Sequence, residues 1–215
     1  MAENATEILE TPMFKCELNT LSRADGSCIY SQDDTVVATA VYGPVEVKQH
    51  KMHIDKAHVE ILFRPKCGAS QLEDRLCESI ISRICETAII TSAYPRTAIY
   101  VIIQEMQNEG SLLASTINAT CLALIHAGIS MNFLFAAVTC AIPQEDEDIQ
   151  FKEGTSEECS LTFVFENTSS KILAIDSHGK FTDEQYKSCL EVCKRSSEVI
   201  FTFYKDMIKK YATKM

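Results

Sequence analysis

The sequence predicts an α+β fold in which a mixed β-sheet is layered with helices. Short runs of β-branched and aromatic residues alternate with turn signals through the first third of the chain, and three later segments switch to helical spacing. The 215 residues are 46% hydrophobic and 23% charged, which is an ordinary globular composition. We therefore expect a single domain over residues 1–215, with residues 1–12 as a flexible N-terminal tail.

The expected strands are short apolar runs bounded by turn residues. A hairpin turn is predicted at Asp25-Gly26, because Asp-Gly is a strong hairpin signal. From their composition, strands are predicted over residues 13–18, 28–32, 35–43, 57–65, 97–106, 133–142, 160–166 and 170–176.

Three helices are expected, and they differ in how their apolar residues are distributed. The helix over 70–91 carries one apolar stripe that runs from Leu72 to Ile89. The helix that begins near Ser111 is apolar over most of its circumference, which predicts burial, and Gly128 is placed to end it. His126 in this helix is interpreted as structural. The last helix opens at Thr182 with a capping box.

The charge and cysteine content argue against several classes of function. The chain has 30 acidic and 20 basic residues, a net charge of −10, so the isolated protein should bind nucleic acid poorly. Its ten cysteines contain no CxxC pair and have no zinc-ligand spacing to histidine, so they are interpreted as reduced core thiols. No run of 18 apolar residues occurs, so no membrane segment is expected. We expect no metal and no cofactor.

The segment NEGSLLAS, residues 108–115, raises the question of a binding site. It joins an apolar strand to an apolar helix, and the first amides of a helix lack intrahelical acceptors, so such a corner can bind an anion. However, Ser111 is followed by Leu112 and Leu113, and the segment contains no arginine or lysine. The corner therefore has the backbone of a phosphate site without a cation.

Six motifs occur in a fixed order: Arg23-x-Asp25-Gly26-Ser27, Asp34-Thr35-Val36 followed by Gly43-Pro44, Pro95-Arg96-Thr97, Glu109-Gly110-Ser111, Asn118-Ala119, and Ala123-Leu124-x-x-Ala127-Gly128. Each motif alone is weak, but in this order, with strands and helices between them, they are specific. The chain resembles the RNase PH family, whose members phosphorolyse RNA from the 3′ end and assemble into six-membered rings. The resemblance covers nearly the whole chain.

The resemblance implies an RNase PH-like fold, similar to domain 2 of ribosomal protein S5. Within the family, the stretches NTLSRADGS and YPRTAIYV favour the ring subunits of the eukaryotic RNA exosome. The implied partners are the other RNase PH-like ring subunits, the RNA-binding cap subunits, and RNA that passes through the assembled ring. No membrane partner is implied. The implied location is the nucleus and nucleolus, and also the cytoplasm.

The same resemblance implies that the phosphate site is degenerate. Active members place Gly-Ser-Arg or Gly-Thr-Arg at the corner, where Gly110, Ser111 and Leu112 stand here. Active members also carry aspartates after the next strand. The corresponding segment 148–158 does not reproduce their spacing, and it is interpreted as a solvated acidic loop whose only candidate acids are Glu153, Glu157 and Glu158. We therefore expect no catalytic residue.

Three basic residues are candidates for contact with RNA. Arg96 matches the Pro-Arg-Thr segment of the family, and Arg64 and Lys66 could face the RNA path from a loop. His50 and His53 are not interpreted as metal ligands, because no carboxylate follows at a supportive spacing.

The predicted function is therefore that of a non-catalytic ring subunit, which supports 3′-to-5′ RNA processing and degradation by building the ring and its RNA channel. An alternative stays open. Ser111 and the acidic segment could support weak phosphorolysis or metal-dependent hydrolysis of nucleic acid. In that case the protein could act as a homodimer outside the exosome.

Overall fold

The computed structural model describes residues 13–142 and 159–214, so the predicted N-terminal tail lies outside the described residues. Within these ranges every predicted strand and helix is present, with ends shifted by a few residues. The elements are β1 Phe14–Leu18, β2 Gly26–Gln32, β3 Thr35–Glu46, the 3₁₀ turn η1 Gln49–Lys51, β4 His58–Arg64, α1 Leu72–Ala88, the 3₁₀ turn η2 Thr91–Ala93, β5 Thr97–Gln107, α2 Leu112–His126, β6 Phe135–Ile142, β7 Cys159–Glu166, β8 Ile172–His178 and α3 Asp183–Lys214.

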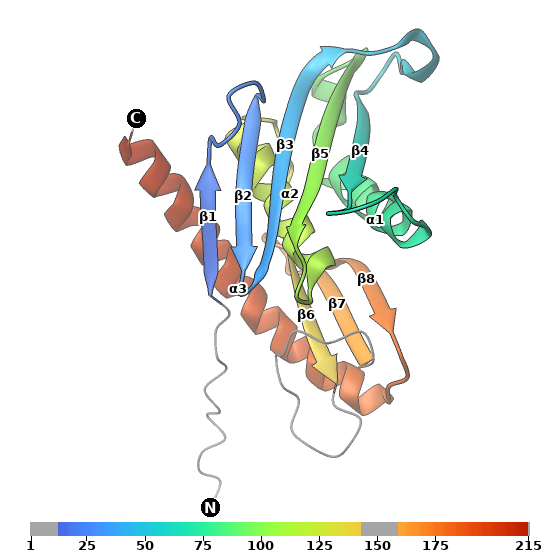
Figure 1. Cartoon of the computed structure of the whole chain (residues 1–215), viewed down its shortest axis with the longest axis vertical. Coiled ribbons are helices and arrows are strands. Elements are labelled where there is room, and N and C mark those ends of the chain that lie inside the picture. Colours follow the sequence, from blue (N-terminus) through green and yellow to red (C-terminus); the bar gives the residue numbers. More distant parts are fainter. Residues whose placement is uncertain (1–12, 143–158, 215) are drawn as a thin grey trace, which may run out of the picture.

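The strands form two sheets. The larger has the order β1-β2-β3-β5-β4 and is mixed, because β4 and β5 are parallel while its other neighbours are antiparallel. The smaller sheet is antiparallel, with the order β6-β7-β8. The long helix α3 runs past both sheets, from β7 near its start to β1 near its end (Figure 1). The α+β class is confirmed, and the strands divide between two sheets.

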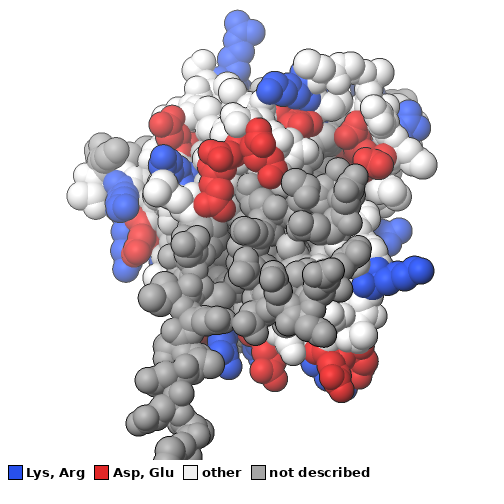
Figure 2. Space-filling view, turned by 60° about the horizontal axis from the view of Figure 1, so that its bottom comes forward, with Lys and Arg blue, Asp and Glu red and all other residues white. Residues whose placement is uncertain are grey.

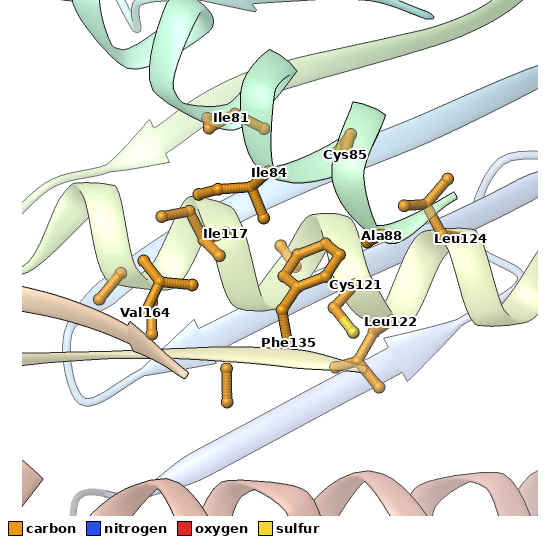
Figure 3. Close-up of a cluster of buried hydrophobic side chains, with 14 of the residues drawn as sticks. Ile81, Ile84, Cys85, Ala88, Ile117, Cys121, Leu122, Leu124, Phe135 and Val164 are labelled. Atoms are coloured by element: carbon orange, nitrogen blue, oxygen red, sulfur yellow. The ribbon is translucent and has the colours of Figure 1, made fainter. Parts of the chain in front are cut away.

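Helix α2 lies at the centre of the molecule, as its apolar circumference predicted. All of its side chains from Ala114 to Leu124 are buried, and it contacts strands of both sheets. Helix α1 covers part of it, and Figure 3 shows the cluster that α1, α2 and β6 share, with Ile84, Ala88, Ile117, Cys121 and Phe135. Burial of one such large apolar side chain contributes about 1.5–3 kcal/mol. The position of α2, and hence of its N-terminal corner, is therefore fixed from several sides.

Polar side chains of α2 also fix its position. The side chain of Asn118 donates to the Ala137 carbonyl at 3.0 Å and accepts from the Ala137 amide at 2.8 Å. The Tyr204 hydroxyl of α3 donates to the same Asn118 oxygen at 2.9 Å. His126 accepts from the Ser27 amide at 3.1 Å and contacts the Tyr211 hydroxyl at 3.1 Å. His126 therefore has the structural role predicted for it.

Two local expectations were wrong in part. The predicted hairpin is present, because β1 and β2 are antiparallel neighbours, but Gly26 is the first residue of β2 and does not form its turn. A Cβ at this position would lie 2.6 Å from the Ala127 Cβ, so glycine is required for close packing of β2 on α2. Leu72 and Leu76, predicted on the buried stripe of α1, are 75% and 57% exposed, because only the C-terminal half of α1 reaches the core.

Other expectations are confirmed. Thr182 and Gln185 form the predicted capping box, with the Thr182 amide donating to Gln185 Oε1 at 2.9 Å and the Gln185 amide donating to Thr182 Oγ1 at 3.3 Å. Gly128 follows α2 at φ 70°, as a helix-ending glycine does. All ten cysteines are free thiols, and seven of them are buried as predicted, whereas Cys16 and Cys77 are half-buried and Cys67 is exposed. Of the helices in the described ranges, none combines the length and hydropathy needed to span a bilayer.

Candidate functional site

The corner that joins β5 to α2 is held by hydrogen bonds from within the protein. Thr35 Oγ1 donates to the Gly110 carbonyl at 2.7 Å and accepts from the Glu109 amide at 3.2 Å. The Gly110 amide donates to Asn108 Oδ1 at 3.1 Å. The amides of Glu109 and Gly110 are therefore already paired with acceptors of the protein.

The backbone of the corner turns sharply. Gly110 has φ 128° and Ser111 has φ 39°, so Ser111 precedes α2 in the left-handed region. A non-glycine residue costs about 1–2 kcal/mol there. Ser111, Leu112 and Leu113 are all half-buried. Leu112 therefore places an apolar side chain, without a donor, where the motif of active family members has an arginine.

The electrostatics of the corner oppose a bound anion. Asp34 and Glu109, next in sequence to the bonded Thr35 and Gly110, are exposed carboxylates. In Figure 2, where the bottom of Figure 1 comes forward, Asp and Glu side chains lie close together in the upper part of the view, with Lys and Arg side chains beside them and along the outline. Carboxylates repel phosphate, and a helix N-terminus supplies only about half a positive charge. The corner alone is therefore a poor phosphate site.

The three predicted RNA-contacting residues are not together. Arg64 ends β4 beside Gln104 of β5, and its carbonyl accepts from the Gln104 side chain at 3.4 Å. The Lys66 amide donates to Glu105 Oε2 at 3.3 Å. Arg64 and Lys66 are exposed near the end of β5 that leads to the corner. Arg96 precedes the start of β5, and the 11 residues of β5 span about 35 Å. The structure thus separates Arg96 from the other two.

The described residues give little support for acid, metal-dependent or thiol catalysis. The acidic segment with Glu153, Glu157 and Glu158 lies outside them. Across residues 13–142 and 159–214, no group of three or more His, Cys, Asp or Glu side chains is placed to hold a metal ion. Burial raises the pKa of the Cys121 thiol to about 12, and burial raises that of Cys77 to about 11. These two thiols stay protonated at neutral pH and are not nucleophiles.

One surface was not predicted from the sequence. The connection between β3 and β4, residues 48–56, is exposed at every position except Lys51. It contains three lysines, two histidines and two large apolar side chains. The sequence signal lies in the three lysines and the HKMH run, whose histidines have no metal-ligand spacing.

Comparison with known proteins tests the resemblance. The model of the 3′ exoribonuclease family, domain 1, matches residues 12–130, more than half of the chain. The exosome complex exonuclease RRP46 homolog of Oryza sativa subsp. japonica is 31% identical over 218 residues, which cover 93% of this chain and 92% of the relative. The exosome complex component rrp46 of Schizosaccharomyces pombe is 32% identical over 203 residues, which cover 86% of this chain and 88% of the relative.

Solved structures agree in fold. The crystal structure of rice (Oryza sativa) Rrp46 matches with a TM-score of 0.83 and 31% identity, covering 91% of this chain and 94% of that chain. A chain of the archaeal exosome core matches with a TM-score of 0.74 over 90% of this chain and 86% of that chain, and at 15% identity it shares the fold alone. The ordered motifs, the family model and the fold lead to one assignment: this chain is a member of the RNase PH family.

Proposed function

We propose that this chain is a ring subunit of an RNA exosome and has no catalytic activity of its own. In this role it builds the ring and part of the channel through which RNA passes to a separate ribonuclease. Relatives named as exosome complex components align with nearly the whole chain, which supports the ring assignment. Its partners are then the other RNase PH-like ring subunits, the cap subunits and the RNA.

The observation that carries the non-catalytic role is the state of the corner. Phosphorolysis requires inorganic phosphate beside a phosphodiester, and the repulsion between these anions must be offset by cations and donors. Here Leu112 supplies neither, and the amides of Glu109 and Gly110 are paired within the protein. Loss of one well-placed donor typically lowers a rate by about 10²–10³-fold, and Leu112 supplies no donor here.

An RNA degradation assay on the purified chain tests this role. With 3′-labelled RNA, inorganic phosphate and divalent metal, we expect no release of nucleoside diphosphates and no metal-dependent hydrolysis. Phosphate-dependent release that disappears in Ser111→Ala would overturn the proposal.

The variants Leu112→Arg and Leu113→Arg test the corner directly, as neighbours with equal added charge. A charge-assisted hydrogen bond contributes about 1.5–3 kcal/mol, so Leu112→Arg should bind inorganic phosphate about 10–100-fold more tightly than wild type. Leu113→Arg should change phosphate affinity little. Phosphate titrations followed by calorimetry would measure both. Equal gains in the two variants would contradict a degenerate site at this corner.

We further propose that Arg64 and Lys66 line part of the RNA path, because both are exposed at the corner end of β5. In an assembled ring, Arg64→Glu with Lys66→Glu should reduce ultraviolet cross-linking of RNA to this subunit without changing ring assembly. Unchanged cross-linking would remove these residues from the path.

The second candidate is a weak nuclease that acts outside the ring, as a homodimer. The rice relative is named as an exosome complex exonuclease, which favours this candidate. Mass measurement of the isolated chain across concentrations, combined with the degradation assay, would support it if a stable dimer showed turnover.

The proposed location is the nucleus and nucleolus, and also the cytoplasm. Imaging of the tagged chain at its native expression level tests this location, and exclusion from the nucleolus would argue against a role in ribosomal RNA processing.

A further inference from the structure

Two pairs of cysteine thiols lie close together in the described residues, and they differ in exposure. The sulfur atoms of Cys16 and Cys28 are 3.4 Å apart, and the sulfur atoms of Cys140 and Cys189 are also 3.4 Å apart. Three of these four side chains are fully buried, and only Cys16 is half-buried. A reagent in solution can therefore reach one sulfur of the first pair and neither sulfur of the second.

The pairing of β1 with β2 brings Cys16 and Cys28 together. The two strands are antiparallel, with Cys16 opposite Tyr30 and Leu18 opposite Cys28. Because side chains alternate between the two faces of a strand, Cys16 and Cys28 lie on the same face as diagonal neighbours. This face of β2 packs against α2, and Tyr30 on the same face is buried too. The register of two short strands thus fixes a pair of sulfur atoms.

A covalent bond between these two sulfur atoms requires a small movement of β1. The sulfur atoms of a disulfide are about 2.05 Å apart, and its two Cα atoms usually lie about 4.4–6.8 Å apart. The Cα atoms of diagonal neighbours typically lie about 7–8 Å apart. β1 is an edge strand of five residues that pairs, among the described strands, only with β2, so few hydrogen bonds oppose such a shift.

The first residue of β1 connects this movement to α3. The centroid of the Phe14 ring lies 5.6 Å from that of the Phe203 ring of α3 and 6.3 Å from that of the Tyr30 ring of β2. The Phe203 ring in turn lies 6.4 Å from the Tyr30 ring. The attraction between aromatic rings depends on their separation and angle, so a shift of β1 changes the contact between Phe14 and α3. A bond between the sulfur atoms would therefore affect the packing of the helix.

The two thiols are suited to different steps of an oxidation. Cys16 is the sulfur that a small oxidant in solution can reach. The hydrogen bond with Cys16, together with burial, raises the pKa of the Cys28 thiol well above its ordinary value. Cys28 is therefore protonated at neutral pH and carries the proton that a leaving oxygen needs in order to depart as water.

We propose that Cys16 and Cys28 are a site of reversible disulfide formation, with hydrogen peroxide as the oxidant. In the first step the Cys16 sulfur attacks one peroxide oxygen, and the O–O bond breaks to give a sulfenic acid and one water. In the second step the Cys28 sulfur attacks the Cys16 sulfur, the S–O bond breaks, and the oxygen leaves with the Cys28 proton as a second water. Two electrons pass from the two thiols to one peroxide. The inference does not rest on the proposed ring function.

The test treats the purified full-length chain with hydrogen peroxide and maps its peptides by mass spectrometry without a reducing agent. We expect a cross-linked pair of peptides that contain Cys16 and Cys28. Reduced glutathione should separate them, because a strained disulfide is reduced readily. Cys140 and Cys189 should cross-link several-fold more slowly, since both are buried. Absence of the first cross-link, or equal rates for the two pairs, would overturn the proposal.

The variant Cys16→Ser tests which sulfur reacts first. It should abolish the cross-linked peptides and leave Cys28 as a thiol, because peroxide does not reach the buried sulfur. The matched control Cys67→Ser makes the same change at an exposed cysteine and should leave the yield of the cross-link unchanged. If Cys16→Ser does not fold, Cys16→Ala supplies the same measurement. Oxidation of Cys28 at the wild-type rate in either Cys16 variant would contradict the assigned order of steps.

Hydrogen exchange tests the movement of β1. In the oxidised chain, the amides around Phe203 should exchange several-fold faster than in the reduced chain, while those around Asn118 at the centre of α2 should not change. Phe14→Leu should remove this difference between the two states and leave the yield of the cross-link unchanged. Equal exchange around Phe203 in the oxidised and reduced wild type would overturn the connection to α3.

Discussion

The polar groups at the two ends of β5 are arranged in opposite ways. At the corner, the Glu109 and Gly110 amides find acceptors inside the protein, and the nearby exposed side chains are acidic. At the connection between β3 and β4, residues 48–56, cations and apolar side chains face solvent while backbone hydrogen bonds hold their positions. Both ends contain a non-glycine residue in the left-handed region, Ser111 and Arg96. The corner thus has no cation beside its exposed carboxylates, whereas the connection presents lysines to solvent.

Most of the motifs that identify the family lie in or beside α2, whereas Pro95-Arg96-Thr97 lies beside the connection between β3 and β4. Substitutions near α2 should therefore affect stability, whereas those at exposed positions of the connection should change it little.

The largest effect on stability is expected at Asn118, which is buried in α2. Asn118→Leu removes the partners of the Ala137 amide, the Ala137 carbonyl and the Tyr204 hydroxyl. A buried unsatisfied polar group costs about 1–3 kcal/mol, so we expect a loss of about 3–5 kcal/mol in the free energy of unfolding. Urea denaturation measures this. Tyr204→Phe removes only one of these hydrogen bonds, so it should lower the free energy of unfolding less. An equal loss in the two variants would contradict this ranking.

Thr35 should have an intermediate effect, because it closes the corner. Thr35→Val removes the acceptor of the Glu109 amide and the donor to the Gly110 carbonyl, at a cost of about 1–3 kcal/mol. Hydrogen exchange of the Glu109 amide should become faster, while exchange within the centre of α2 should change little. An unchanged Glu109 amide would mean that Thr35 does not hold the corner.

His126 should make stability depend on pH. Burial lowers the pKa of His126 below its ordinary value of 6.5, so the folded protein favours the neutral ring that accepts from the Ser27 amide. The unfolded chain then binds the proton more readily, so this contribution is complete above pH 6.5 and is lost as the pH falls below it. His126→Gln should flatten the decline in unfolding free energy between pH 7 and pH 5. The control His50→Gln, at an exposed loop residue, should leave that decline in place.

The smallest effect on the isolated chain is expected at the connection between β3 and β4. Ile54→Ser should change the free energy of unfolding by less than about 0.5 kcal/mol, because the side chain makes little buried contact. Thermal unfolding of the purified variant measures this. A loss of several kcal/mol would show that Ile54 belongs to the core of the monomer, and it would erase the contrast between the two ends of β5.

Much of the fold could be predicted from the sequence because its signals are local. Period and composition located the strands and helices, and the Thr182 capping box needed only two residues three positions apart. The burial of α2 followed from an apolar circumference that no exposed helix would carry. The corner was also found from sequence, since a strand, a glycine and a helix start are contiguous.

The elements, the family motifs and the leucine in place of a cation can all be identified in the sequence. The tertiary structure determines how the corner amides are paired, because Thr35 is 75 residues from Gly110 along the chain. It also decided that Arg96 lies far from Arg64, and that Leu72 faces solvent. The physical reason is the same in each case. Hydrogen-bond partners and buried faces depend on remote segments, whose approach local periodicity does not encode.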